Sequence, residues 1–289
     1  MQTNYKKKIL IVGASGYIGN SLVNTLKEKK KFELNYIISN KSNKFYYKNK
    51  TNVFKINDTS NNFIKKIKKI NTIYFLSSNE NIYNSDSFEL NSDVTNLLLK
   101  VINLLIKYNN KAKLIYLSSE NAHGNVKNHK DYPLNLYGIE KLLNEKIIEI
   151  YSFNYNLNFL SLRLSNIYGF TENLDNNFKS SLNRIVINLF NKNELNLFKN
   201  KKCIRSFTNI NDVCNILITI IDKKKIFNGK VYYFGNNEKI TFQNVINLIK
   251  NQYNKKFPDK IKVNNLDNKL SNFEMRNFYL SKKNNLWYI

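Results

Sequence analysis

The stretch that decides the fold is Lys8-Ile9-Leu10-Ile11-Val12-Gly13-Ala14-Ser15-Gly16-Tyr17-Ile18-Gly19. Its first five residues form an apolar run typical of a buried strand, and the segment from Ser21 to Leu26 begins an amphipathic helix. A strand, a glycine turn and a helix in this order make a corner that binds phosphate. The glycines allow a tight turn, and the first helical amides point at the anion. The spacing is G-x-x-G-x-x-G, and its place between strand and helix favours a dinucleotide site over a plain turn.

Composition places the chain among globular proteins. Its 289 residues are 42% hydrophobic, enough to bury one large core or two joined ones. No apolar run reaches the ~18–20 residues of a membrane helix, and the opening to Val12 runs into the glycine turn rather than a cleavage site. We therefore expect a cytoplasmic protein with no membrane partner. Cys203 and Cys214 form no metal-ligand spacing and no disulfide framework, so no metal is expected.

The formal net charge of +25 would usually indicate a nucleic-acid partner. Asparagine is also in great excess, and alanine occurs only at Ala14, Ala112 and Ala122. Because lysine, asparagine and isoleucine have AT-rich codons, an AT-rich genome explains both biases, whereas a selected basic patch explains only the lysines. Nucleic acid is therefore not expected as a partner. In this background the eight glycines and four arginines gain weight as positions where their special chemistry is needed.

Alternating strands and helices follow the glycine turn. Strands are expected at 33–38, 52–56, 72–76 and 112–117, with helices from about 63 to 70 and from 88 to 108. This alternation predicts an α/β fold with a doubly wound parallel sheet of the Rossmann kind.

The end of the second strand bears on the cofactor. An acidic residue there would bind the adenosine ribose of NAD, but the chain has Asn40 and Lys41. No carboxylate repels a 2′-phosphate, and Lys41 could attract one. The cofactor is therefore expected to be NAD or NADP, with NADP slightly favoured. Asp58, after the third strand, could reach the adenine.

Tyr137 and Lys141 stand four residues apart, which places them on one face of a helix. Pro133 breaks the chain just before, and apolar residues follow at helical spacing. A nearby ammonium stabilises a phenolate, so a tyrosine with an ordinary pKa near ~10 becomes usable as an acid or base at neutral pH. In a lysine-rich chain the pair alone also fits a surface tyrosine near a lysine.

Further motifs occur in order along nearly the whole chain. Ser119 stands five residues before Gly124, Asn91 stands four before Thr95, and Arg205 opens the stretch 205–213. Segments 162–169, 231–235 and 281–287 add to the series. With the glycine turn and the Tyr137–Lys141 pair, the chain resembles the extended short-chain dehydrogenase/reductases, the nucleotide-sugar epimerase/dehydratase group.

This resemblance implies a role for each matching residue. Tyr137 would exchange a proton with a sugar hydroxyl or carbonyl, Lys141 would lower its pKa and hold the nicotinamide ribose, and Ser119 would hydrogen-bond the same oxygen. The cofactor-binding residues would be Gly13, Ser15, Gly16, Tyr17, Ile18, Gly19, Asn40, Lys41, Asp58, Leu76, Asn91, Tyr137 and Lys141. The substrate-binding residues would be Ser119, Glu120, Asn121, Asn166 and Arg205, with Asn166 and Arg205 on the diphosphate.

Some residues depart from the family's pattern. His123 replaces a usual tyrosine and either lines the substrate cleft or fills the space of that ring, which is the favoured alternative. Ser206 replaces a usual aspartate. The alternative for Arg205 is a structural ion pair with Asp212.

The reaction is less determined than the fold. Family 4,6-dehydratases have an acid and a glutamate base where this chain has Glu120 and Asn121, and an amide cannot abstract a proton, so dehydration is disfavoured. A nucleotide-sugar 4-epimerase stands slightly ahead of an NADPH-dependent 4-keto reductase. A non-catalytic dinucleotide- or RNA-binding relative is the third class. The nucleotide, the sugar and the direction of reaction stay open.

Domain organisation and assembly follow from the same resemblance. Residues 1–168 would form a dinucleotide-binding Rossmann domain and 169–289 mainly a smaller substrate-binding α/β portion, with about 208–236 crossing back. The segment 170–202 would set sugar specificity. The expected partners are a nucleotide-diphosphate sugar and a second copy of the chain. The homodimer would form through the helix from Phe88 and the helix of Tyr137.

Overall fold

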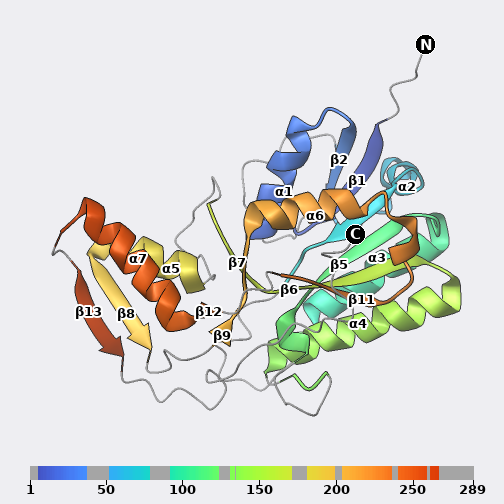
Figure 1. Cartoon of the computed structure of the whole chain (residues 1–289). Coiled ribbons are helices and arrows are strands. Elements are labelled where there is room, and N and C mark those ends of the chain that lie inside the picture. Colours follow the sequence, from blue (N-terminus) through green and yellow to red (C-terminus); the bar gives the residue numbers. More distant parts are fainter. Residues whose placement is uncertain are drawn as a thin grey trace.

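A seven-stranded parallel sheet forms the centre of the computed structural model, with strand order β11-β6-β5-β4-β1-β2-β3 (Figure 1). The structure describes residues 6–37, 52–78, 92–123, 131–133, 135–170, 181–198, 204–235, 240–258 and 261–266, and the strand count refers to these. The strands are β1 (Lys7–Val12), β2 (Phe32–Ile37), β3 (Val53–Phe54), β4 (Thr72–Phe75), β5 (Lys113–Ser119), β6 (Asn158–Leu164) and β11 (Val231–Phe234).

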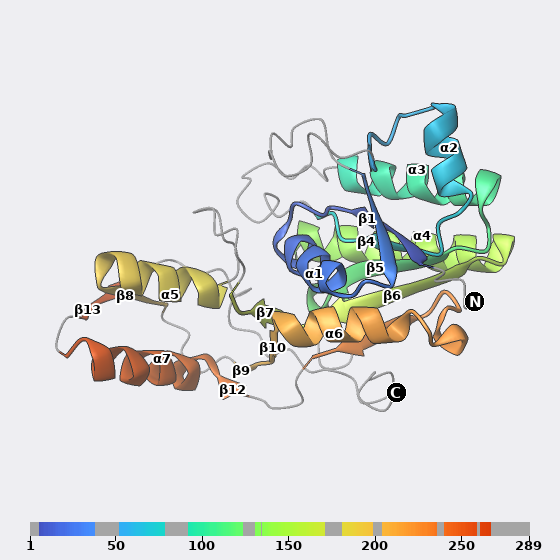
Figure 2. The same cartoon turned by 90° about the horizontal axis from the view of Figure 1, so that it is seen from above.

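Helices cover both faces of this sheet (Figure 2). Ile9 and Ile11 of β1 pack toward one side, and Leu10 and Val12 pack toward the other. Burial on both faces explains why β1 reads as a continuous apolar run rather than an alternating one. The predicted doubly wound α/β fold is confirmed. One face carries α1 (Tyr17–Glu28) and α6 (Ile210–Ile220), and the other carries α2 (Asn61–Ile67), α3 (Asp93–Tyr108) and α4 (Leu136–Tyr155).

A smaller layer stands beside the sheet, at the left of Figure 1. It is built from α5 (Ser181–Lys192), β8 (Glu194–Phe198), α7 (Phe242–Lys256) and β13 (Lys262–Leu266), and β8 pairs with β13. Its own apolar core consists of Ile185, Leu189, Leu195, Ile246 and Tyr253.

Two short strand pairs link the layer to the sheet. β7 (Asn166–Tyr168) pairs with β10 (Phe207–Asn209), and β9 (Ile204–Arg205) pairs with β12 (Ile240–Thr241). The chain leaves the sheet after β6, returns through β10 and α6 to β11, and leaves again through β12. The division into a cofactor part and a substrate part, which remains a proposal, would follow these crossings.

Element boundaries differ from the sequence expectations in two instructive places. β5 continues through Ser119, because Ser118 and Ser119 pair with Arg163 and Leu164 of β6. The sequence did not predict this extension, because two serines do not continue an apolar pattern. α1 already begins at Tyr17, inside the glycine turn. No helix within the described ranges is both long and apolar enough to span a bilayer.

Candidate active site

The glycine corner is held by close backbone contacts. Gly13 has a φ of +89°, and a Cβ there would lie 2.6 Å from the amide nitrogen of Ser77. A Cβ on Gly19 would lie 2.2 Å from the carbonyl oxygen of Gly13, so α1 packs directly on the turn. These two positions therefore require glycine for the chain's own packing.

Gly16 differs from Gly13 and Gly19, because the described residues leave open space beside it. An added Cβ would meet only the carbonyl oxygen of Gly13, at 3.4 Å. Gly16 is also the N-cap of α1 and offers no side chain to the first helical amides. An open glycine at an uncapped helix N-terminus suits the pyrophosphate of a dinucleotide, which accepts hydrogen bonds from such amides.

The proposed catalytic residues come from the end of β5 and the start of α4. Asn135 caps α4 by accepting a hydrogen bond from the amide of Gly138 at 2.6 Å. A Cβ on Gly138 would lie 2.4 Å from the carbonyl oxygen of Asn121, so the helix rests directly on the 3-10 turn η3 (Glu120–Ala122) that follows Ser119. This contact places the first turn of α4, with Tyr137, beside the end of β5.

Lys141 is buried and points toward two aromatic rings. Its Nζ donates to the carbonyl oxygen of Leu117 at 2.9 Å and lies 5.5 Å from the ring centre of Tyr137 and 5.0 Å from that of Tyr116. An ammonium so placed favours negative charge on a neighbouring phenolate. The spacing of Tyr137 and Lys141 thus places the Lys141 ammonium over the ring of Tyr137.

Ser119 is oriented by Asn121. Its Oγ accepts hydrogen bonds from the backbone amide of Asn121 at 3.2 Å and from Nδ2 of the same residue at 3.0 Å. A hydroxyl has two acceptor sites and one donor. Both acceptor sites are used, so Ser119 can offer its proton to a substrate oxygen.

Three of the predicted substrate-binding residues gather beside Ser119. The Nδ2 of Asn166 donates to Oε1 of Glu120 at 2.7 Å and to the carbonyl oxygen of Ser206 at 3.2 Å, while Oε2 of Glu120 has no hydrogen-bond partner within the described ranges. Burial raises the pKa of Glu120 to about 8, although the charge of Arg205 and the amide of Asn166 act in the opposite direction. An uncharged Glu120 would not repel an anionic group bound by Arg205.

An apolar cavity of about 530 Å³ adjoins this group. Phe207 pairs with Asn166 across β10 and β7, and Ile240 pairs with Arg205 across β12 and β9, so the lining continues directly from the polar residues. The cavity is lined by Tyr168, Gly169, Phe170, Leu182, Asn183, Val186, Ile187, Phe207, Ile240, Val245, Leu248 and Ile249.

The other predicted cofactor residues are placed as follows. The Tyr17 hydroxyl donates to the carbonyl oxygen of Gly169 at 2.9 Å, which ties the glycine corner to the segment after β7. The amide of Leu76 donates to the carbonyl oxygen of Val12, and Oδ1 of Asp58 accepts from the amide of Ser60. Ser15 and Ile18 are half-buried in the corner. Asn40, Lys41 and Asn91 lie outside the described residues.

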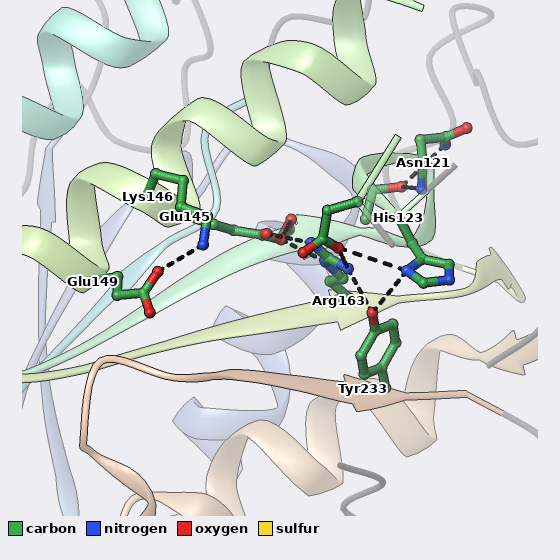
Figure 3. A network of polar contacts seen from close by, with 10 residues as sticks. Asn121, His123, Glu145, Lys146, Glu149, Arg163 and Tyr233 are labelled. Carbon is green, nitrogen blue, oxygen red and sulfur yellow. Dashed lines mark hydrogen bonds and ion pairs between the residues drawn. The ribbon is translucent and has the colours of Figure 1, made fainter. Parts of the chain in front are cut away.

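A buried polar network lies behind the site and was not predicted (Figure 3). The Arg163 guanidinium, from β6, donates to both carboxylate oxygens of Glu145 on α4, at 2.8 and 2.6 Å, and to Oδ1 of Asp131 at 2.7 Å. It also donates to the hydroxyl of Tyr233 on β11, and the Ser118 hydroxyl donates to Glu145. The network therefore joins the end of β5, where Ser119 stands, to the helix that carries Tyr137.

His123 completes this network at the protein's half-buried edge. Its Nδ1 lies 3.6 Å from Oδ1 of Asp131 and 3.4 Å from the Tyr233 hydroxyl. Burial alone would raise the pKa of Asp131, but His123 and Arg163 lower it to about 2. One signal for the network was present in the sequence, because arginine is rare in this lysine-rich chain and Arg163 needs a bidentate fork that lysine lacks.

Comparison with known proteins identifies a matching family. The model of the NAD dependent epimerase/dehydratase family matches residues 9–235. The putative UDP-glucose 4-epimerase of Methanocaldococcus jannaschii is 25% identical over 260 residues, 84% of this chain and 82% of the relative. The chain spans about half the length of four other curated relatives that it matches, between 40% and 49%.

Solved structures share the fold. The UDP-N-acetylglucosamine 4-epimerase of Methanobrevibacter ruminantium M1 aligns with a TM-score of 0.75 at 18% identity, over 92% of this chain and 87% of that one. The dTDP-glucose 4,6-dehydratase of Bacillus anthracis str. Ames aligns with a TM-score of 0.68 at 19% identity, over 91% and 85%. Epimerases and dehydratases thus share this architecture.

Proposed function

We propose, since the chain belongs to the NAD dependent epimerase/dehydratase family, that it is a nucleotide-sugar 4-epimerase that acts by reversible hydride transfer at the sugar's 4-position. The observation that carries the proposal is the convergence of Tyr137 with the buried Lys141 and the donor-oriented Ser119. A module that only binds a dinucleotide needs none of these three side chains.

The residues of the glycine corner fit a dinucleotide, because Gly16 leaves open space at an uncapped helix N-terminus. The cofactor supplies the hydride chemistry when it is bound. Further contacts are proposed from the sequence alone for Asn40, Lys41 and Asn91. The residues proposed to hold the cofactor at the described positions are Gly13, Ser15, Gly16, Tyr17, Ile18, Gly19, Asp58, Leu76, Tyr137 and Lys141.

In this mechanism the chain's side chains hold and move one proton. The Tyr137 phenolate takes the proton of the sugar's 4-hydroxyl, and the Tyr137 hydroxyl returns it to the 4-keto oxygen, while the Ser119 hydroxyl donates a hydrogen bond to the same oxygen as charge develops. The Lys141 ammonium favours the phenolate form of Tyr137. Arg205 binds the diphosphate, for which the arginine fork offers two parallel hydrogen bonds. Asn166 would join it by exchanging one of the hydrogen bonds that its Nδ2 donates to Glu120 and to Ser206.

The apolar cavity would receive part of the substrate beyond the diphosphate. It begins at the strand pairs that carry Asn166 and Arg205, and Tyr168, Phe170 and Phe207 give it aromatic walls. Such walls suit flat or apolar groups, with orientation fixed by a few polar contacts. Sugar specificity would depend on this lining, and only part of it, from Phe170 to Ile187, falls within the segment 170–202 that was expected to set it.

A 4-keto reductase that consumes NADPH is the second candidate. It is favoured by Asn40 and Lys41, which stand where an acidic residue would select NAD. Dehydration is disfavoured because Asn121 cannot act as a base and its amide already holds Ser119.

Mass spectrometry of ligands retained through native purification separates the epimerase from the reductase. Tightly held NAD indicates an epimerase that recycles it, whereas a site that is empty and takes up NADPH indicates a reductase.

The direct test is turnover. The purified protein is incubated with NAD or NADPH and a panel of nucleotide sugars and their 4-keto forms. Products are resolved by chromatography, and nicotinamide absorbance is followed. Tyr137→Phe is expected to remove turnover, whereas Tyr132→Phe, at an exposed tyrosine just before α4, is expected to retain it. Full activity in Tyr137→Phe would refute the mechanism, and no turnover of any substrate would count against an enzyme.

We further propose a homodimer formed through α4. Its outer face exposes Ile139, Leu143, Ile150 and Phe153, which recur at helical spacing. Phe153 is 89% exposed, an unusual state for a large apolar side chain in a lone monomer.

A further inference from the structure

Glu140 is a buried carboxyl group for which the mechanism above has no use. It lies on α4 between Tyr137 and Lys141 and is 1% exposed, and neither of its side-chain oxygens has a hydrogen-bond partner among the residues that the structure describes. An ionised carboxylate in that position is costly, because it has lost water and gained no donor. Such a group needs a specific explanation.

A second buried polar residue of the same helix has the same deficit. Asn144 lies one turn further on, where it shares a face with Glu140. Its Nδ2 donates to the Tyr116 hydroxyl at 3.2 Å, while its Oδ1 finds no hydrogen-bond donor in the described part of the chain. The two side chains thus present three buried oxygens that all need a donor. A single proton on Glu140 turns one of these acceptors into a donor that can serve Asn144.

The charges around Glu140 allow this proton. In the described part of the chain, the titratable groups that act on Glu140 are Lys141 on its own helix and Tyr116 on β5. Burial raises the pKa of Glu140, and the Lys141 ammonium opposes that effect. No ion pair within 4.0 Å joins Glu140 to Lys141 among the salt bridges of these residues.

We propose that Glu140 is a positioning residue that holds a proton at neutral pH, and that loss of this proton weakens the effect of the Lys141 ammonium on Tyr137. A neutral Glu140 leaves the positive charge of Lys141 undiminished beside Tyr137. An ionised Glu140 would offset that charge and make the phenolate harder to form. The consequence for turnover rests on the proposed function, whereas the protonation of Glu140 does not.

The test is an NMR titration of the whole chain labelled with ¹³C at glutamate Cδ and tyrosine Cζ. It needs neither substrate nor cofactor, so a wrong proposed function would leave its result unchanged. Glu140→Gln or Glu140→Ser identifies the Glu140 signal, and Tyr137→Phe identifies that of Tyr137. Glu140 is expected to be still protonated at about pH 6, where an ordinary glutamate is ionised. Glu140 is expected to lose its proton before Tyr137 does, so its charge is present when Tyr137 titrates. The titration midpoint of Tyr137 is therefore expected to move down by at least about half a pH unit in Glu140→Gln.

Glu149 provides the matched control. It lies on the same helix but is exposed, and it pairs with Lys146 at 2.8 Å (Figure 3). Glu149→Gln should leave the Tyr137 midpoint unchanged. The proposal is overturned if Glu140 is ionised at that pH, as it would be with the Asn144 amide turned to donate to it. An unmoved Tyr137 midpoint in Glu140→Gln would overturn it equally. If Glu140→Gln does not fold, the Glu140 signal of the unaltered chain still decides whether Glu140 holds its proton.

Discussion

At the scale of single residues, Asn121 controls what Ser119 can do. Its amide occupies an acceptor site of the serine and leaves the hydroxyl proton for a substrate. Asn121→Asp would replace that donor by a carboxylate, which would take the Ser119 proton for itself. We expect kcat to fall at least about tenfold with little change in KM, because the lost contact forms mainly in the transition state.

Asn121→Ala is the matched control for this prediction. It removes the side-chain contact but keeps the backbone amide on Ser119, so it should retain more activity than Asn121→Asp. Steady-state kinetics on the two variants decide the point. Equal activity in both variants would show that the polarity of Ser119 does not matter.

Glu120 predicts a pH dependence of stability. Its pKa is raised from 4.5 to about 8, so the folded protein keeps a proton that the unfolded chain loses above about pH 4.5. The contribution to stability is therefore full below about pH 4.5 and is lost as the pH rises to about 8. As the pH rises across this window, the free energy of unfolding should fall less in Glu120→Gln than in the unaltered chain. The difference should be up to about 1.4 kcal/mol per pH unit.

The measurement is urea denaturation of the unaltered chain and of Glu120→Gln at about pH 5 and pH 8.5. Glu149→Gln, at an exposed position, serves as the control and should follow the unaltered chain. A free energy of unfolding with the same pH dependence in all three proteins would contradict the raised pKa.

At the scale of elements, the Glu145–Arg163 pair fastens α4 to β6. Both side chains are almost fully buried, and the contact is bidentate. Glu145→Gln leaves the Arg163 charge with only part of its compensation. We expect a loss of about 3–5 kcal/mol in the free energy of unfolding, the usual cost of breaking a buried pair from one side.

The exposed pair of Lys146 and Glu149 on the same helix gives the contrast. Removing it by Glu149→Gln should cost less than about 1 kcal/mol, since exposed pairs contribute little. Chemical denaturation of both variants tests the difference. Similar losses would mean that burial of the Arg163 network contributes nothing beyond a surface pair.

Much of the arrangement of helices and strands could be predicted from the sequence. The apolar run before Gly13 and the alternation after it identified the parallel sheet, and the spacing of Tyr137 and Lys141 identified α4. The contact of Glu120 with Asn166 was not foreseen as a pair, because it joins residues 46 apart in sequence, and periodicity describes only local order. The partners of Arg163 come from three different segments for the same reason.

At the scale of the whole molecule, the outer face of α4 predicts assembly. Replacing Ile150 and Phe153 by glutamate would put charges into the proposed interface, and we expect a monomer. The apparent dimer of the unaltered chain should be seen by light scattering at micromolar concentration. Leu248→Glu, at an exposed apolar position on α7, should leave the dimer intact. A monomeric unaltered chain would refute the proposal.

The double crossing of the chain between the sheet and the smaller layer has a consequence for engineering. The layer is assembled from two separate stretches, one between β7 and β9 and one after β11, with α6 and β11 returned to the sheet between them. A chimera that imports a relative's specificity must therefore graft both stretches together. Replacing everything after 168 in one piece would also exchange β11 and α6, and with them part of the sheet that presents Ser119.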